Sequence, residues 1–135
     1  MYVVDASVLV SYLAGAEYSS GARAALIEGE RQGGLWAPHL IDAEVGHALR
    51  RAVLAGELGQ RAAGSALTDL YEFPINRVSH LGLLKRAWAM RANLTFYDAL
   101  YVTLAEQLQT ALLTLDGRLS RAPGVEIVVQ SLIPR

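Results

Sequence analysis

The 135-residue chain contains no cysteine, and this absence excludes disulfide bonds, thiolate zinc sites and cysteine nucleophiles together. It fits the reducing conditions of the cytoplasm, so we expect a cytoplasmic protein. An excess of charge of one sign is also lacking, because 12 basic and 13 acidic side chains give a formal net charge of −1. No global positive field therefore indicates a nucleic acid, and any site for a polyanion must be a local patch.

Histidine is scarce and long apolar runs are missing. The three histidines, His39, His47 and His80, are badly spaced for a metal site, and we expect surface or capping roles for them. No apolar run is long enough to span a membrane. The apolar start, MYVVDASVLVSYLAGA, lacks a basic leader and is interrupted by Asp5, so we interpret it as the first strand and helix of the fold rather than a signal peptide.

Hydrophobic residues make up 53% of the chain, which has the size of one domain and can bury about two-thirds of the surface of its unfolded form. No repeat, low-complexity segment or linker divides it, so we expect a single domain over residues 1–135. Strands that alternate with helices predict an α/β fold, a three-layer α/β/α sandwich around a mostly parallel sheet. The predicted strands are Tyr2–Val4, Leu35–Ala37, Phe73–Val78, Ala111–Leu115 and one near Glu126–Val129. The predicted helices are Val8–Leu13, Ser19–Arg31, Leu40–Ala55, Leu58–Tyr71, His80–Arg91 and Phe96–Leu108.

One predicted helix carries an acid in its apolar face. Within the segment LTFYDALYVTLAEQL, residues 94–108, an apolar stripe at helical spacing consists of Leu94, Tyr101, Val102, Ala105 and Leu108. Asp98 falls inside this stripe. Thr95 and Asp98 have the spacing of a capping box, so a structural role at the helix N-terminus is one explanation. A metal ligand is the other, since a buried ionised carboxylate requires a partner and a helix N-terminus supplies only part of one.

In folds with an open parallel sheet, ligands bind at the carboxyl ends of the strands. Three further acids stand at positions that such a sheet can bring to this edge. Asp5 follows the first strand, and Asp116 follows the strand LLTL. Glu44 lies in the first turns of the helix after the second strand, on the flank of its apolar stripe. Each has a structural alternative: Asp5 as a helix cap, with Ser7 as a second candidate, Asp116 as a turn former before Gly117, and Glu44 as a first-turn acid.

Bringing these carboxylates together has an energetic consequence. Two like charges about 5 Å apart at an effective dielectric of about 20 repel by roughly 3 kcal/mol. A cation must therefore be present, or some of the acids must hold protons. Ligands that are all oxygen suit Mg²⁺ or Mn²⁺. Such ions at an acidic site indicate phosphodiester hydrolysis, because they lower the pKa of the attacking water and stabilise the leaving oxygen.

Four segments of the chain resemble the PIN-domain ribonucleases, and especially the VapC-type toxins of bacterial toxin–antitoxin pairs. The segments are VVDASVLV around Asp5, APHLIDAEVGHALRR around Glu44, LTFYDALYVTLAE around Asp98 and LLTLDGRL around Asp116. They follow the family's order and spread over nearly the whole chain, and the last two form a fairly specific pair. The chain departs from the family pattern after Val45, where it has Gly46 and His47.

The resemblance implies a PIN-like fold and a metal-dependent endoribonuclease whose catalytic, Mg²⁺- or Mn²⁺-binding acids are Asp5, Glu44, Asp98 and Asp116. It also implies Ser7 and Thr114 as supporting hydroxyls. The implied partners are an RNA substrate (tRNA, rRNA or mRNA), a cognate antitoxin and a second copy of the chain in a homodimer. Asp42 is a weaker substitute for Glu44, because it lies on the opposite flank of the apolar stripe.

Arginines are the candidates for phosphate contacts, because they bind phosphate oxygens bidentately without reading sequence. The candidates are Arg50, Arg51, Arg86, Arg91, Arg118 and Arg121. Arg118 ranks first for RNA binding because it lies two residues from Asp116. Aromatic rings could stack on bases, but the spacing favours the core or a dimer interface for Tyr97, Tyr101, Trp36 and Trp88.

Three other classes of protein compete with the nuclease. A phosphatase with an aspartyl nucleophile needs a second acid two residues after Asp5, where this chain has Ser7. A dinucleotide-binding domain needs a glycine-rich turn after the first strand, and none is present. A PIN-like module that binds RNA or a partner protein without cutting RNA remains the main alternative.

Overall fold

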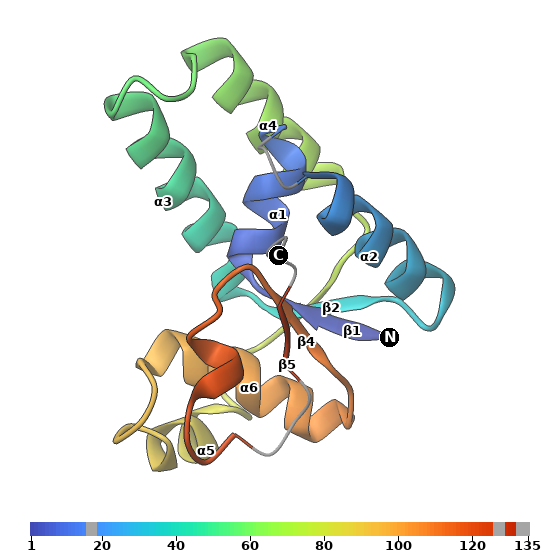
Figure 1. Cartoon of the computed structure of the whole chain (residues 1–135), viewed down its shortest axis with the longest axis vertical. Helices are drawn as coiled ribbons and strands as arrows, with labels where there is room; N and C mark the ends of the chain where they lie inside the picture. The colour runs from blue at the N-terminus through green and yellow to red at the C-terminus, as the bar shows by residue number, and fades with distance from the viewer. Residues whose placement is uncertain (16–18, 126–128, 132–135) are drawn as a thin grey trace.

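The computed structural model describes residues 1–15, 19–125 and 129–131, which form a five-stranded sheet with helices on both faces (Figure 1). The strands are β1 (Tyr2–Val4), β2 (Leu35–Pro38), β3 (Asn76–Val78), β4 (Leu112–Thr114) and β5 (Val129–Ser131). The helices are α1 (Ala6–Leu13), α2 (Ser19–Arg31), α3 (Leu40–Leu54), α4 (Gln60–Glu72), α5 (Leu84–Ala89) and α6 (Phe96–Leu108), with a 3-10 turn, η1, at Leu119–Arg121. The strand order is β3-β2-β1-β4-β5, and every neighbouring pair is parallel. The predicted α/β fold with a parallel sheet is therefore confirmed.

Figure 1 shows the three layers of the sandwich. Helices α1 and α2 cover one face of the sheet, with α3 and α4 projecting beyond them as a hairpin, and α5 and α6 cover the other face. Parallel strands require crossover connections, which these helices supply. The chain runs from β1 to β2 and β3 on one side and returns to β4 on the other side of β1. The carboxyl ends of β1 and β4 therefore form the switch point at which ligands bind in open α/β sheets.

The core occupies both faces of the central strands. Val3, Val4, Leu112 and Leu113 have no exposed surface, as expected of parallel strands covered on both sides. Helix α6 is equally enclosed, because every residue from Ala99 to Ala105 is buried. It packs on β1, β2 and β4 and is covered in turn by α5, so its apolar surface is wider than one stripe. None of the described helices is long and apolar enough to cross a membrane.

The start of α3 is held by two residues from β3 and the loop after it, Arg77 and His80, which lie 35 or more positions later in the sequence. The Leu40 N–H donates a hydrogen bond to His80 Nε2 at 2.8 Å, so His80 caps the helix from the loop after β3. Asp42 accepts two hydrogen bonds from Arg77 of β3, at 2.7 Å and 3.0 Å. The capping role expected of His80 is therefore confirmed, and Asp42 is held by the sheet rather than by the acids near Glu44.

Two predicted elements begin three or four residues later in the structure than in the prediction. The helix predicted over His80–Arg91 is shorter, because His80 caps α3 and residues 81–83 form turns before α5 begins at Leu84. The strand predicted over Phe73–Val78 begins only at Asn76, because Phe73 ends α4. The final strand lies at Val129–Ser131, and residues 126–128 of the predicted strand lie outside the described residues.

Two helix glycines lead to predictions of opposite sign. A Cβ at Gly46 of α3 would meet nothing within 4 Å, so Gly46→Ala should raise the free energy of unfolding by about 0.5–1 kcal/mol through helix propensity. A Cβ at Gly29 of α2 would lie 2.6 Å from Leu35 Cδ2 and 2.7 Å from Tyr2 Cδ2. Gly29→Ala should therefore lower the free energy of unfolding by about 1–2 kcal/mol through overpacking. Urea unfolding compares the two variants, and effects of the same sign would contradict this packing of α2.

Candidate active site

Asp5 stands at the carboxyl end of β1 and caps α1. Its Oδ1 accepts hydrogen bonds from the Val8 N–H, at 3.3 Å, and from the Ser7 hydroxyl, and its Oδ2 accepts one from the Thr114 hydroxyl. Only 8% of the residue is exposed. Burial raises the pKa of Asp5 to about 6, although these three hydrogen bonds lower it. Asp5 therefore caps α1, which is one of the two explanations expected. The hydrogen bonds it accepts lower its pKa less than desolvation raises it.

The two hydroxyls around Asp5 join β1 to the turn after β4. Thr114 Oγ1 donates to Asp5 and accepts a hydrogen bond from the Asp116 N–H at 2.8 Å. Ser7 Oγ likewise donates to Asp5 and accepts from the Leu115 N–H at 3.0 Å. Each hydroxyl thus links the Asp5 carboxylate to the backbone that carries Asp116.

Asp116 is paired with Arg118. The Asp116 carboxylate accepts hydrogen bonds from Arg118 Nε at 3.1 Å, from Arg118 Nη2 at 3.0 Å and from the Arg118 N–H at 2.9 Å. The Arg118 side chain is 86% exposed, so the pair lies at the surface. Hydrogen bonding from Arg118 lowers the pKa of Asp116, which is therefore ionised at neutral pH.

Asp98 lies in the first turn of α6. The helix is capped by Thr95, whose hydroxyl oxygen accepts a hydrogen bond from the Asp98 N–H at 3.1 Å. The Asp98 carboxylate is partly buried, and this burial raises its pKa. The Thr95 hydroxyl and the Arg118 charge lower the pKa, whereas the charge of Asp116 raises it. Capping therefore involves the Asp98 backbone, while its carboxylate belongs to a cluster of acids.

Glu44 approaches the same place from α3 and meets Tyr101 of α6. Burial raises the pKa of Glu44, and the Tyr101 hydroxyl lowers it. Tyr101 is only 2% exposed, and its own pKa is raised far above the usual range by burial and by the Glu44 charge, so it remains a neutral donor. Although the two groups interact, neither Glu44 Oε1 nor the Tyr101 hydroxyl makes a hydrogen bond of ordinary geometry within the described residues. Both atoms are therefore buried without a full partner.

Asp98 is the member of the cluster that couples to all the others. Its charge raises the pKa of Asp5 and that of Glu44, and its own pKa is raised by Asp116. The structure thus brings together the four acids singled out in the sequence. They stand somewhat apart, since no three histidine, aspartate or glutamate side chains of the described ranges are arranged to hold a metal ion as they are.

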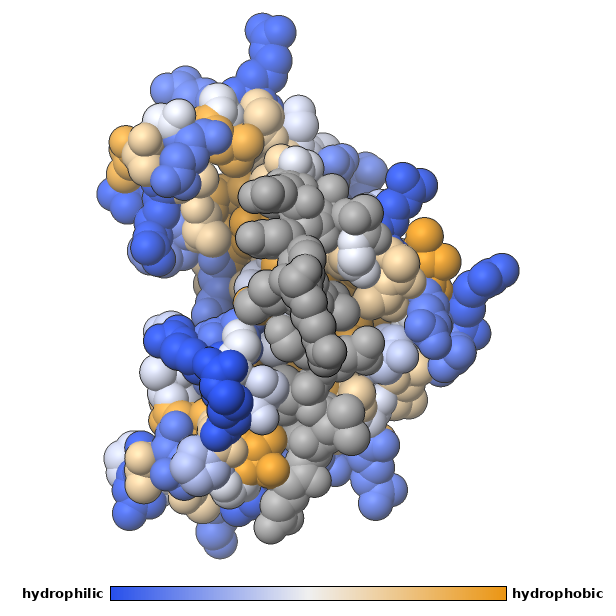
Figure 2. Space-filling model, viewed as in Figure 1, coloured by the Kyte–Doolittle hydropathy of each residue, from blue (hydrophilic) through white to orange (hydrophobic). Residues whose placement is uncertain are grey.

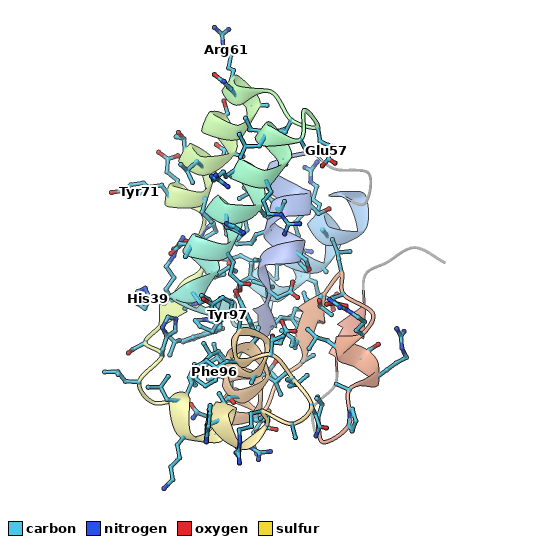
Figure 3. All side chains as sticks on the ribbon, turned by 90° about the vertical axis from the view of Figure 1, so that its left-hand side faces the viewer. His39, Glu57, Arg61, Tyr71, Phe96 and Tyr97 are labelled. Carbon is cyan, nitrogen blue, oxygen red and sulfur yellow. The ribbon has the colours of Figure 1, made fainter. Side chains whose placement is uncertain are left out.

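A cleft of about 830 Å³ opens beside these acids between α1, α3, the start of α6 and the turn after β4. Its lining includes Ser7, Glu44 and Asp116, with Tyr97 on the α6 side. Figure 2 shows the molecule indented between α3 above and α6 below, and Figure 3 shows Tyr97 between these two helices. Glu44 and Asp116 are therefore open to a ligand in the cleft.

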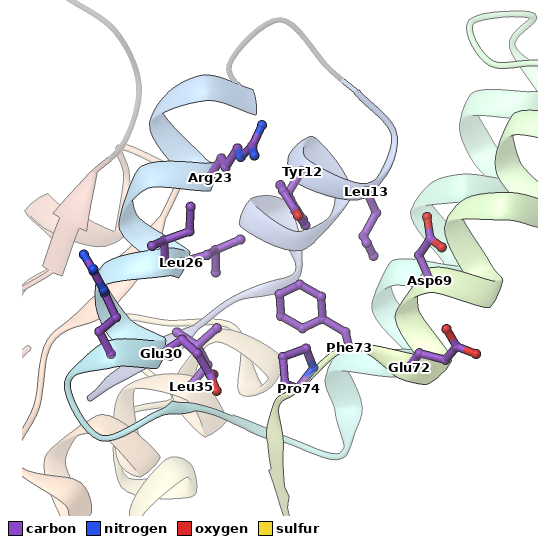
Figure 4. Close-up of a pocket in the computed structure, with 12 residues that line it drawn as sticks. Tyr12, Leu13, Arg23, Leu26, Glu30, Leu35, Asp69, Glu72, Phe73 and Pro74 are labelled. Atoms are coloured by element: carbon purple, nitrogen blue, oxygen red, sulfur yellow. The ribbon is translucent and has the colours of Figure 1, made fainter.

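A separate groove of about 560 Å³ lies between α1, α2 and the segment after α4 (Figure 4). Tyr12 and Phe73 meet in it edge to face, with ring centroids 5.8 Å apart. Charged side chains such as Arg23, Glu30 and Asp69 surround it. It contains none of the four acids.

Comparison with known proteins identifies the family of this chain. The model of the PIN domain matches residues 2–125. The chain belongs to the PIN-domain family. Among its relatives in that family, Ribonuclease VapC1 of Mycobacterium tuberculosis is 49% identical over 125 residues, which cover 91% of each chain. Ribonuclease VapC9 of the same species is 38% identical over the full length of both chains. The chain is thus a homologue of the VapC ribonucleases, and the resemblance seen in the sequence is confirmed.

Solved structures share this fold. Mycobacterium tuberculosis VapC20, described as a toxin that cleaves the sarcin-ricin loop, superposes with a TM-score of 0.70 at 17% identity and covers 90% of this chain and 94% of its own. VapBC2 from Rickettsia felis, bound to a promoter DNA fragment, gives a TM-score of 0.71 at 12% identity, covering 96% and 97%. At such identities these two structures support the PIN-like fold alone.

The other residues singled out in the sequence have varied positions. His39 and His47 are exposed, as expected, and Tyr101 is in the core. Tyr97 and Trp88 are not in the core, because they are 56% and 60% exposed. Among the arginines, Arg86 pairs with Glu106, Arg91 lies over the Trp88 ring, and Arg51 lines the cleft.

The pairing of Tyr101 with Glu44 was not predicted from the sequence. A signal was present, since Tyr101 lies three residues after Asp98 and so shares its side of the helix. Ser11 was also missed: its buried hydroxyl lacks a partner within the described residues and lies at the cleft, one helical turn after Ser7. That spacing of four residues was the available signal.

The raised pKa of Asp5 predicts a pH-dependent stability. The folded chain holds the Asp5 proton up to about pH 6, whereas the unfolded chain releases it near 3.8. Stability that is fully present at acid pH should therefore fall as the pH rises through this window. Asp5→Asn removes the charge but replaces one acceptor oxygen with an amide group that cannot accept from Thr114, so the comparison is relative: the stability of the metal-free variant should rise by about 2–3 kcal/mol relative to wild type as the pH is raised through the window. Unfolding in EDTA across the window measures this gap, and a gap that does not grow with pH would contradict the assignment.

Proposed function

We propose that this chain is a metal-dependent endoribonuclease that hydrolyses RNA phosphodiester bonds as the toxin of a toxin–antitoxin pair. The observation that carries the proposal is the coupling of Asp98 to three other acids at the carboxyl edge of a parallel sheet, beside an open cleft. Relatives named as ribonucleases, at up to 49% identity, support it. The absence of cysteine fits a cytoplasmic location, where RNA is available.

The residues present fit Mg²⁺ or Mn²⁺. The donors are carboxylate oxygens, which these hard ions prefer. Glu44 Oε1 is buried without a full partner, and a cation or its water would satisfy it. Since Mg²⁺ is usually held by one or two carboxylates together with waters and substrate phosphate, acids that stand apart are suitable ligands. The residues that would hold the ion are Asp5, Glu44, Asp98 and Asp116.

The chain's own residues prepare this site. A bound ion supplies an activated water and stabilises the leaving oxygen of the RNA. The Ser7 and Thr114 hydroxyls orient the Asp5 carboxylate and favour its ionised form. Arg118 keeps Asp116 ionised and presents an exposed guanidinium beside it, which is suited to a phosphate of the substrate.

The partners follow from the same proposal. We propose an RNA substrate, a cognate antitoxin and a second copy of this chain. Structures described as a toxin–antitoxin complex from Klebsiella pneumoniae and as VapBC2 from Rickettsia felis are among the proteins of this fold, which supports an antitoxin partner. An antitoxin that covers the cleft would block RNA without changing the acids.

Asp98→Asn tests the proposed metal site. The variant keeps the shape of the side chain and removes one charge, so cleavage of a mixed tRNA and rRNA preparation in Mg²⁺ or Mn²⁺ should fall at least about a hundredfold. Wild type should cut only with metal and not in EDTA. In the absence of RNA, Mn²⁺ should raise the melting temperature of wild type and raise that of the variant much less.

Asp69→Asn is the matched control, because Asp69 is exposed on α4 and lines the separate groove. It makes the same change of charge and should leave cleavage unaltered. Equal cleavage by wild type and Asp98→Asn would show that Asp98 is not a metal ligand and has only a structural role at the start of α6. If folded wild type binds Mn²⁺ but cuts neither tRNA nor rRNA, the assay is repeated with mRNA, and failure there too would favour a non-catalytic module.

Arg118→Ala tests the proposed phosphate contact. Its loss should raise KM several-fold and change kcat less, because the guanidinium serves substrate binding. Arg118→Lys should recover only part of the loss, since an ammonium group cannot bind a phosphate bidentately. Steady-state kinetics on one RNA compares the three proteins, and an unchanged KM in Arg118→Ala would exclude the contact.

A further inference from the structure

The cleft has a second end, beyond the acids, that the proposed hydrolysis leaves unexplained. On α3 the cleft is lined by Glu44, His47, Ala48 and Arg51. These positions have the spacing of one helix face, so they form a stripe that runs from the acid to a cation. Seven residues of helix separate Glu44 from Arg51 by about 10 Å along the axis. The stripe therefore extends well past the bond that the acids would hydrolyse.

Arg51 differs from two other arginines near the acids, which are held in ion pairs. Arg77 is held by Asp42, and Arg118 by Asp116. Arg51 is exposed, and its side chain has no hydrogen bond or ion pair within the described part of the chain. Its neighbour Arg50 lines a different groove, between α3 and α4, together with Leu49 and Val53. Two adjacent arginines of one helix thus face different surfaces, and only Arg51 faces the cleft.

Tyr97 lines the cleft at its other end, near the acids. It precedes Asp98 at the start of α6, lines the same cleft as Arg51 and is 56% exposed. In Figure 3 it lies between the first turns of α3 and the start of α6. An exposed ring beside a site for a polyanion is suited to stacking on a base, which is worth about a fivefold or greater gain in affinity for each base.

We propose that Arg51, His47 and Tyr97 form a binding subsite for an unpaired RNA strand. Arg51 and His47 contact phosphates of the strand beyond the cleaved bond, and Tyr97 stacks on one of its bases. The strand must be unpaired because bases in a duplex are stacked on each other and do not offer their faces. This inference rests on the proposed nuclease function, since it takes RNA as the occupant of the cleft.

Binding to an uncleaved probe tests the subsite separately from hydrolysis. The probe is a fluorescently labelled, mixed-sequence single-stranded RNA, measured by anisotropy with Mg²⁺ in the Asp98→Asn background. Adding Arg51→Ala should weaken binding and make the slope of log affinity against log salt shallower by about 0.7, the value for one lost phosphate contact on a single strand. Adding Arg50→Ala, the matched control on the other face of α3, should leave the slope closer to its original value.

Tyr97 requires its own comparison. Tyr97→Ala should weaken binding about fivefold or more, whereas Tyr97→Phe should keep most of the affinity because the ring does the stacking. Tyr71→Ala is the control, since Tyr71 is 89% exposed on α4 outside the cleft lining. Both substituted side chains are exposed, and melting temperatures confirm that the variants fold.

Three results would overturn the subsite. One is an equal effect of Arg51→Ala and Arg50→Ala, another is full binding by Tyr97→Ala, and the third is equally tight binding of a duplex probe. In the case of full RNA binding by the variants, loss of affinity for a purified antitoxin would assign the surface to protein docking instead. Failure of wild type to cut RNA would contradict the proposed nuclease function. The subsite would still be accepted or rejected by the binding assay, because that assay does not depend on cleavage.

Discussion

Negative charge held near the edge of the sheet without enough counter-charge is the constraint on which the site depends. Asp5, Glu44 and Asp98 all lose solvent, and each has its pKa raised mainly by that burial. Of these four acids, Asp116 at the rim is the only one with an arginine ion pair among the described residues. The hydroxyls of Ser7 and Thr114 offset part of the cost at Asp5 but bring no positive charge. These buried, repelling carboxylates lower the stability of the folded chain. Binding of a divalent cation or of protons reduces that loss.

The parallel fold explains why the acids meet. Val4 lies opposite Leu113 in the sheet, so the residues that follow these strands, Asp5 and the Thr114 turn, emerge together. Helices α3 and α6 then bring Glu44 and Asp98 to the same edge by their early turns. Asp98 interrupts the apolar face of α6 because that face packs on the sheet, and its first turn reaches the carboxyl ends of the strands. An acid that looks misplaced in an amphipathic pattern is thus well placed in the fold.

Much of this arrangement was accessible from the sequence. Continuous apolar strands and strand–helix alternation predicted the parallel sheet, and acids placed after strands predicted which side chains would gather. Less local features were not accessible. The cap of α3 by His80 and the Asp42–Arg77 pair join segments far apart in sequence, and no short pattern encodes them. The Tyr101–Glu44 contact and the exposure of Tyr97 depend on how α6 is rotated against α3, which periodicity alone does not fix.

Binding of a divalent metal ion by the four acids is the central claim. Crystals soaked in Mn²⁺ and measured near the manganese absorption edge test it most directly, because the anomalous signal locates the ion without reference to activity. We expect a manganese peak among the carboxylates of Asp5, Glu44, Asp98 and Asp116, and its absence from matched crystals of Asp98→Asn. Wild-type crystals that show manganese only elsewhere, or none among these acids at saturating metal, would contradict the claim.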